Sequence, residues 1–294
     1  MNNNSEIEKR LALKKLFADR MATATIDESV PYVSRLVRRE PEPEPEPTPK
    51  VDKVKITKKQ VNQAIQQLSK ECFKPIVEID ESNVEYSGSK YFGKAWLAND
   101  EQWPTNEAGD YLIFVLQLDI ATLPETYKNE LGKTGLMQLF FDFEYEGETL
   151  TRIVYPDNNG SYHEQPLNNS DYTDYYIEGE KAQQKIIKAW KSFQDFPHNQ
   201  EELSEDLHEL YEELMESEES LELSAFDGDK LGGYASWAQA GYSSEKLLFQ
   251  LGAGDLVQNR SLESHAPNLF ASDGTAHVFY NKEDKSFEFD WACG

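Results

Sequence analysis

The octapeptide KLGGYASW, Lys230–Trp237, places two glycines between a lysine and two aromatic residues. A glycine-rich phosphate-binding loop normally leads into a helix. Here a Tyr-Ala-Ser-Trp stretch follows the glycines, so we predict a structural turn that leads into a strand. Gly233 is expected to give this turn its backbone freedom, and Gly93 is expected to do the same in the similar stretch KYFGKAW at 90–96.

The same pattern of motifs occurs twice along the chain. The first set contains KYFGKAW, FVLQLD at 114–119 and GLMQLFF at 135–141, and the second contains KLGGYASW, LLFQLG at 247–252 and GTAHVFY at 274–280. The same order over nearly equal lengths predicts an internal duplication. Gln117 and Gln250 then take matching places in apolar strands. We predict that they clamp each other's backbones near a pseudo-twofold axis, with ligand binding as the alternative.

The elements expected around these motifs indicate an α+β fold. Strands are predicted where β-branched and aromatic residues concentrate, at 75–79, 111–118, 135–143, 149–156, 246–251, 275–280 and 286–291. Helices are predicted from a Thr57–Gln60 capping box through Cys72, over KAQQKIIKAWKSF at 181–193, and over the acidic stretch 199–219. We therefore expect an internally duplicated domain with a mixed or antiparallel sheet and flanking helices.

The N-terminal part is predicted to be separate from this domain. A helical pattern in the first residues is followed by RREPEPEPEPTPKV at 38–51, where alternating Pro and Glu favour a stiff, extended linker. The predicted organisation is a helical segment at 1–37, a Pro/Glu linker at 38–52 and a main domain at 53–294. Within the main domain we expect repeat halves at about 76–156 and 221–294, with a helical insertion at about 177–220.

Charge is distributed unevenly along the chain. The net charge is −25, yet residues 1–75 carry 15 Lys and Arg against 11 Asp and Glu. The stretch from Asp195 to Asp229 carries 14 acidic residues and no Lys or Arg. Such a surface repels nucleic acid and attracts a basic partner, although an acidic surface also simply maintains solubility.

Several motifs together resemble the YwqG-like family, a bacterial family without a settled biochemical function. The resemblance covers roughly residues 75–294, and it rests on SKYFGKAW, Trp103-Pro104, FVLQLDIATLP, GLMQLFF, KLGGYASWAQ, LLFQLG and the C-terminal FYN and FDW stretches. Lys94, Ala95 and Ala235 depart from the residues usual in that family. The resemblance implies an α+β, internally duplicated fold and no established catalytic residues.

The sequence offers no strong catalytic or metal-binding motif. His208 and Glu212 fall one ligand short of a zinc helix motif and are expected on a solvated helix face. Cys72 and Cys293 cannot form a disulfide framework. Cys72 fits the apolar stripe of its predicted helix, so a core thiol is favoured over a reactive one. We expect no cofactor and no metal, and the missing motifs favour a protein that is not an enzyme over one that is.

These patterns favour a cytoplasmic interaction protein, in its most specific form an immunity-type inhibitor of a basic toxin. We expect no membrane-spanning segment and no nucleic-acid partner. The expected partner-binding surface consists of Glu201, Glu202, Glu205, Asp206, Glu209, Glu212, Glu213 and Glu216. The alternative is a small-ligand binder or hydrolase with a cleft between the two repeat halves, lined by Trp96, Trp103, Gln117, Trp237, Gln239 and Gln250.

Overall fold

The computed structural model describes residues 57–82, 84–142, 148–167, 182–197, 226–237, 246–252, 264–266, 269–270 and 274–293. All of them belong to one compact unit, Lys55–Gly294. Of the described residues, 45% lie in strands and 13% in helices. None of the helices among them combines the length and the apolar composition needed to cross a bilayer. The predicted N-terminal helix and Pro/Glu linker lie outside the described residues.

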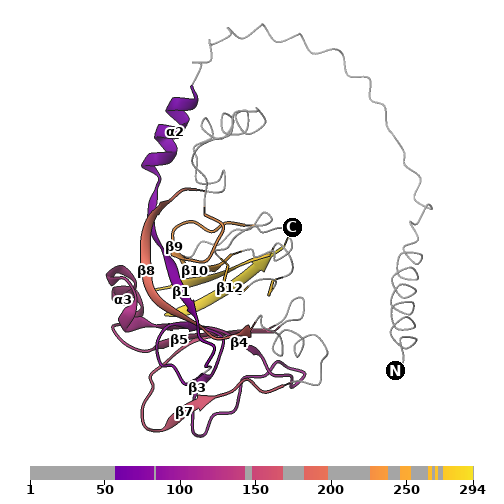
Figure 1. Ribbon diagram of the computed structural model, residues 1–294. Helices are drawn as coiled ribbons and strands as arrows, with labels where there is room; N and C mark the ends of the chain where they lie inside the picture. The colour runs from indigo at the N-terminus through magenta and orange to yellow at the C-terminus, as the bar shows by residue number, and fades with distance from the viewer. Residues whose placement is uncertain are drawn as a thin grey trace, which may run out of the picture. The chain divides into compact units, whose positions relative to one another are not determined.

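Most of the described strands form one ten-stranded sheet (Figure 1). The order is β12-β11-β10-β9-β1-β8-β2-β4-β5-β6. Its strands are β1 (Lys70–Ile79), β2 (Lys90–Tyr91), β4 (Ile113–Asp119), β5 (Leu136–Phe141), β6 (Thr149–Val154), β8 (Lys185–Asp195), β9 (Lys230–Gly232), β10 (Lys246–Leu251), β11 (Thr275–Asn281) and β12 (Ser286–Ala292). A second sheet pairs β3 (Ala95–Ala98) with β7 (Gly160–His163).

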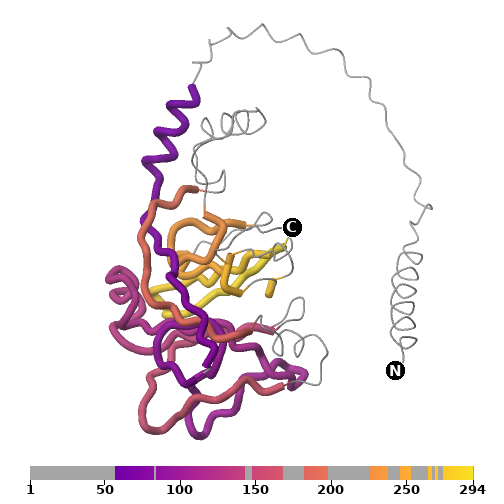
Figure 2. Tube along the Cα trace, viewed as in Figure 1, coloured from indigo at the N-terminus to yellow at the C-terminus, as the bar shows by residue number. Residues whose placement is uncertain are grey.

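The long strands β1 and β8 form the centre of the ten-stranded sheet. They pair antiparallel from Lys70↔Asp195 to Ile79↔Lys185, with a register shift after Ile76. Figure 2 shows the indigo β1 trace and the salmon β8 trace running side by side. The strands at the two ends of the order, β6 and β12, also lie near each other, so the sheet is nearly closed.

The main core lies inside this sheet and joins strands from both ends of the order. Phe141 on β5 packs edge-on against Trp291 on β12, with ring centroids 6.2 Å apart. The Phe270 ring lies 4.9 Å from that of Phe141. Tyr91 on β2 and Leu231 on β9 are buried in the same core cluster. These contacts explain why the ends of the sheet approach each other.

The expected α+β, internally duplicated fold with flanking helices is wrong. The described residues form a mostly antiparallel, nearly closed sheet, with only two α-helices, α2 (Lys58–Gln67) and α3 (Glu125–Leu131), and a 3₁₀ turn at Ile120–Thr122. The helix predicted over 181–193 is instead strand β8. Its apolar residues fit a helical period, but β1 offers a complementary ten-residue strand, and tertiary pairing outweighs weak local preference.

The region from Thr57 to Ile79 starts with the predicted helix, but the helix is shorter than predicted. The Thr57 N–H donates to Gln60 Oε1 at 2.9 Å, which confirms the helix start. Val61 and Ile65 are buried. The helix ends at Gln67, however, and Cys72 lies on β1 rather than on the helical stripe. β1 therefore begins five residues before the predicted strand.

The other predicted strands are confirmed within two residues at their starts, as β4, β5, β6, β10, β11 and β12. The two predicted turns are confirmed as well, because Gly93 and Gly233 have φ angles of +77° and +81°. The helix α3 was not predicted. It follows Pro124, which is the residue just before its first turn.

Candidate functional site

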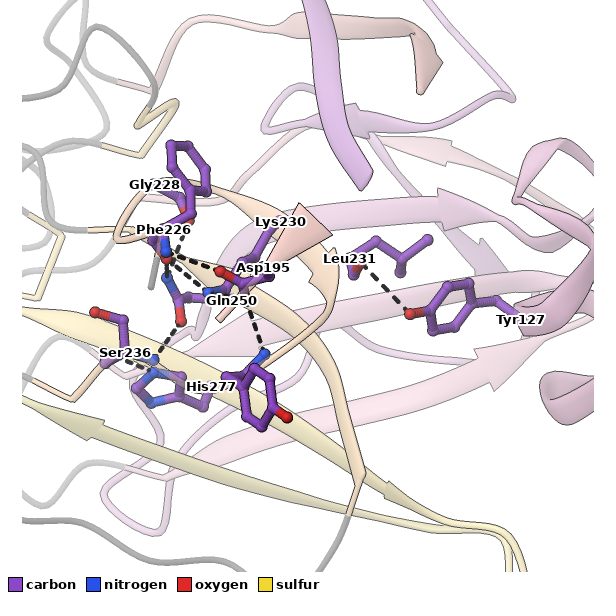
Figure 3. Close-up of polar contacts among 10 residues, drawn as sticks. Tyr127, Asp195, Phe226, Gly228, Lys230, Leu231, Ser236, Gln250 and His277 are labelled. Carbon is purple, nitrogen blue, oxygen red and sulfur yellow. Dashed lines mark hydrogen bonds and ion pairs between the residues drawn. The ribbon is translucent and has the colours of Figure 1, made fainter. Parts of the chain in front are cut away.

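The short strand β9 carries a lysine that is fully buried together with its counter-ion. Lys230 Nζ lies 2.8 Å from Asp195 Oδ2, and both side chains are 0% exposed. Nζ also donates to the Phe226 carbonyl oxygen at 2.6 Å. The remaining capacity of the Asp195 carboxylate is used by backbone N–H groups of Phe226 and Tyr234, each at 2.9 Å. Figure 3 shows these groups meeting beside β9.

Gln250 on β10 fastens the loop before β9 to the segment after it (Figure 3). Its Nε2 donates to the carbonyl oxygens of Gly228 at 3.0 Å and Phe226 at 3.2 Å. Its Oε1 accepts from the Ser236 N–H at 2.8 Å. A fully buried amide that makes three hydrogen bonds to backbone is a structural fastener.

Gln117 on β4 makes a comparable contact elsewhere in the sheet. Its Nε2 donates to the Gly88 carbonyl oxygen at 2.9 Å. The two glutamines thus have the expected backbone-binding role, but they do not clamp each other. Each glutamine holds the loop that precedes one of two short strands, β2 and β9, which we call the lysine strands. The pairing is equivalent in the two places: Lys90 on β2 is opposite Gln117, and Lys230 on β9 is opposite Gln250.

A second group of titratable residues, which we call the Asp229 cluster, consists of Tyr91, Lys185, Asp229 and His265. The Asp229 carboxylate accepts from the Gly252 N–H at 2.7 Å and from the His265 N–H at 3.0 Å. Lys185 Nζ donates to the His265 carbonyl oxygen at 2.5 Å. The Tyr91 and His265 rings lie 5.2 Å apart. Four residues from distant parts of the chain therefore meet at one point.

Burial shifts the pKa values throughout the Asp229 cluster. It raises the pKa of Asp229 to about 6, against the opposing hydrogen bonds from Gly252 and His265. It lowers the pKa of His265 to about 4, with a further lowering from the Lys185 charge. The pKa of Lys185 falls and that of Tyr91 rises well above its usual value, again through burial. A carboxyl group that is partly protonated near pH 6 has the acid–base character that catalytic groups need.

A family model described as "Domain of unknown function (DUF1963)" matches residues 89–291. The chain belongs to the DUF1963 family. No curated protein matches the chain. The matched range contains β2 through most of β12, so the DUF1963 domain includes the lysine strands, Gln117 and Gln250, and the whole Asp229 cluster.

Five of the six residues predicted to line a cleft are described, and all five are buried within the DUF1963 domain. Trp103 belongs to a core cluster with Phe140 and donates from Nε1 to the Leu112 carbonyl oxygen at 2.8 Å. Trp237 belongs to a different cluster with Phe279. Trp96 is 6% exposed, and Gln117 and Gln250 are fully buried. Gln239 lies outside the described residues.

Other predicted residues have simple placements. The acidic surface from Glu201 to Glu216 lies outside the described residues and stays a prediction. Cys72 is buried, and burial followed by the Asp195 charge raises the pKa of its thiol, so the core interpretation is confirmed. In the part of the chain that the structure describes, no group of three or more His, Cys, Asp or Glu side chains is placed to hold a metal ion.

Sequence reasoning missed the Lys230–Asp195 ion pair and the Asp229 cluster. One available signal was the charged pair Asp229-Lys230, which is separated by one residue, Leu231, from two consecutive glycines. The other members are far away in the chain; Asp195 precedes Lys230 by 35 residues. Their meeting depends on the strand order, which the sequence pattern did not predict.

Proposed function

We propose that this DUF1963 protein is an interaction protein that binds a basic protein partner through its acidic surface. The observation that carries the proposal is the stretch from Asp195 to Asp229, which has 14 acidic residues and no Lys or Arg. Asp195 and Asp229 at its two ends are buried, so the acidic residues between them would form the surface. The most specific form is an immunity-type inhibitor that covers a basic toxin. A cytoplasmic location, a bacterial origin and the relation to YwqG-like proteins belong to the same proposal.

The physical basis is long-range electrostatic attraction. A concentrated negative surface raises the rate at which a positively charged partner arrives, and it disfavours nucleic acid as a competitor. Such attraction weakens within about 10 Å at 0.1 M salt. Binding through this surface should therefore weaken strongly as salt is added.

The test uses affinity capture from the native host at low and at high salt. A first variant changes Glu and Asp to Gln and Asn at Glu201, Glu202, Glu205, Asp206, Glu209, Glu212, Glu213 and Glu216. A control variant makes the same number of changes at exposed acidic residues of the described part: Glu71, Glu78, Glu81, Asp100, Glu107, Glu125, Asp157 and Glu283.

We expect the wild type and the control variant to capture a basic protein at low salt, and the first variant to lose it. Because the two variants have the same net charge, this result would locate binding in the acidic stretch. Equal capture by both variants, or capture that ignores salt, would contradict the proposal.

A second candidate function, small-ligand binding or hydrolysis, is favoured by the Asp229 cluster. Its perturbed carboxyl and imidazole groups lie together, with His265 half-buried. A thermal-shift screen of metabolites with the wild type and the variants Asp229→Asn and His265→Ala tests it. A compound that stabilises the wild type and neither variant would support this function; stabilisation of all three would exclude the cluster as the binding site.

A further inference from the structure

Two lysines in the DUF1963 domain begin turns of the same local shape. Lys90 on β2 and Lys230 on β9 are both 0% exposed. A glycine with positive φ follows each lysine by three residues, Gly93 at +77° and Gly233 at +81°. The two lysines can therefore be compared directly, as buried amines in similar backbone surroundings.

The side chain that packs against each glycine differs. A Cβ atom on Gly233 would lie 2.3 Å from Asp195 Oδ2, whereas a Cβ atom on Gly93 would lie 2.1 Å from Gln184 Oε1. Asp195 is the last residue of β8, and Gln184 immediately precedes the first. A carboxylate therefore stands at one end of β8, and a neutral amide takes the corresponding place at the other end.

This difference leaves Lys90 without a counter-ion among the residues that the structure describes. Lys230 Nζ forms its ion pair with Asp195, but Lys90 Nζ donates only to the Lys94 carbonyl oxygen, at 2.6 Å, among the described residues. Gln184 Oε1 is buried and has no hydrogen-bond partner within the described residues. Burying an ammonium group without a partner is costly, and neutralisation is the usual response.

The groups around Lys90 do not replace the missing carboxylate. The rings of Tyr162 on β7 and Phe114 on β4 lie 5.0 Å and 6.0 Å from Nζ. The carboxylates of Glu85 and Asp80 favour the charged amine from a distance, and the Lys94 ammonium opposes it. Burial outweighs all of these and lowers the pKa of Lys90 to about 7.

We propose that Lys90 is a proton switch in the core: the native protein holds it as an uncharged amine at mildly alkaline pH, and binding of a proton favours local opening of β2. Opening transfers the ammonium group to water, where it is stable. This inference is independent of the proposed partner binding, since it concerns a buried lysine on β2 and none of the acidic residues proposed to bind the partner.

The sign of the pH dependence follows from the two protonation equilibria. The pKa of Lys90 is about 7 in the native protein and 10.5 for an ordinary lysine. Between these values the unfolded chain holds one more proton than the native protein. Native stability therefore rises with pH across this interval, by about tenfold in the folding equilibrium constant per pH unit, and is lowest below pH 7.

The test compares the folding equilibrium constant, from urea unfolding at pH 6 to 10, in the wild type and in the variants Lys90→Met and Lys230→Met. The ratio of the wild-type constant to that of Lys90→Met should rise about tenfold per pH unit above pH 7. The corresponding ratio for Lys230→Met, which removes a paired lysine, should rise only at higher pH. Identical pH profiles for wild type and Lys90→Met would overturn the proposal.

A second measurement needs no variant of Lys90. The Phe92 N–H donates to the Val115 carbonyl oxygen at 3.0 Å, and the Ile187 N–H donates to the Ser89 carbonyl oxygen at 2.9 Å, so these amides report on β2. Their hydrogen-exchange protection in the wild type should increase between pH 7 and 9, while that of the Tyr234 amide should not. Protection of Phe92 and Ile187 that does not change with pH would also overturn the proposal.

Discussion

At the scale of single residues, the polar groups around β9 depend on one another rather than on solvent. The Asp195 carboxylate accepts hydrogen bonds from the Lys230 ammonium group and from two backbone N–H groups, so both of its oxygens are hydrogen-bonded. A buried ion pair of this kind adds little stability relative to apolar residues of similar size. Removing one partner is nevertheless strongly destabilising, because it leaves the other charge buried and unpaired. The pair therefore specifies the local structure more than it stabilises it.

Removing one partner of this pair should be costly. We expect Lys230→Met and Asp195→Asn each to lower the free energy of unfolding by about 3–5 kcal/mol, since each leaves a buried polar group without its partner. The double variant should lose clearly less than the sum of the two. Urea unfolding of all four proteins measures the coupling, and additive losses would show that the two side chains do not interact.

Glycine is required at position 233 for two separate reasons. Gly233 has a φ angle of +81°, and a Cβ atom would lie only 2.3 Å from Asp195 Oδ2. Gly109 is a matched control, because its φ is +90° but nothing lies within 4 Å of the added atom. Gly109→Ala should lose about 1–2 kcal/mol from backbone strain alone, and Gly233→Ala should lose more. Equal thermal-unfolding losses would argue against the contact with Asp195.

At the scale of secondary-structure elements, side chains fasten loops to strands. Gln250 holds β10 to the loop before β9 and to the segment after it with three hydrogen bonds, whereas Gln117 makes one bond of normal length to the Gly88 carbonyl. The number of backbone groups left unpaired by substitution therefore differs between the two sites.

We therefore expect the same substitution, Gln to Ala, to destabilise the protein to different extents at the two positions. Gln250→Ala should lower the free energy of unfolding by more than Gln117→Ala, by about 1–3 kcal/mol for each additional backbone group left buried and unpaired. Chemical denaturation of the two variants provides the comparison. The opposite order would mean that the hydrogen bonds of Gln250 are replaced by other groups or water.

The elements that sequence patterns predict well are those whose strand character is local. β4, β5, β10 and β11 are mostly apolar segments that contain aromatic residues, and all were predicted. β8 was not, because Ile186, Ile187 and Trp190 suit one face of a helix equally well. Its strand form depends on β1, which lies more than 100 residues earlier.

The candidate site was less predictable than the strands for the same reason. The backbone-binding role of Gln117 and Gln250 follows from single polar residues within apolar strands. The partners of Lys230 and Asp229 come from β8 and from the region after β10, so they become visible only when the strand order is known. The two lysines are followed by glycines at the same spacing, so nothing in the sequence indicated that a carboxylate, Asp195, packs against one glycine and an amide, Gln184, against the other.

At the scale of the whole molecule, the matched family range is smaller than the sheet it belongs to. The family model matches residues 89–291, yet β1 lies at residues 70–79 and pairs with both β8 and β9. Without β1 the sheet order would be interrupted at its centre, and the edges of the long strand β8 and the short strand β9 would be exposed. Exposed edges of this kind promote aggregation.

The minimal folding unit should therefore include β1. We expect a chain that starts at residue 57 to unfold cooperatively as a monomeric sheet protein, and a chain that starts at residue 89 to aggregate or to lack cooperative unfolding. Circular dichroism with thermal unfolding and size-exclusion chromatography distinguish the two. Cooperative unfolding of the shorter chain would show that β8 and β9 do not need β1.

We predict that the two buried lysines differ in charge because only Lys230 has a carboxylate partner among the described residues, and side-chain NMR of ¹³C-labelled lysine measures this most directly. Burial lowers the pKa of both lysines, but the Asp195 carboxylate opposes this for Lys230, so Lys90 should titrate at about pH 7 and Lys230 at higher pH. Assignment by Lys90→Met and Lys230→Met identifies the two signals. A Lys90 signal that titrates near 10.5, or above that of Lys230, would contradict this assignment of charge.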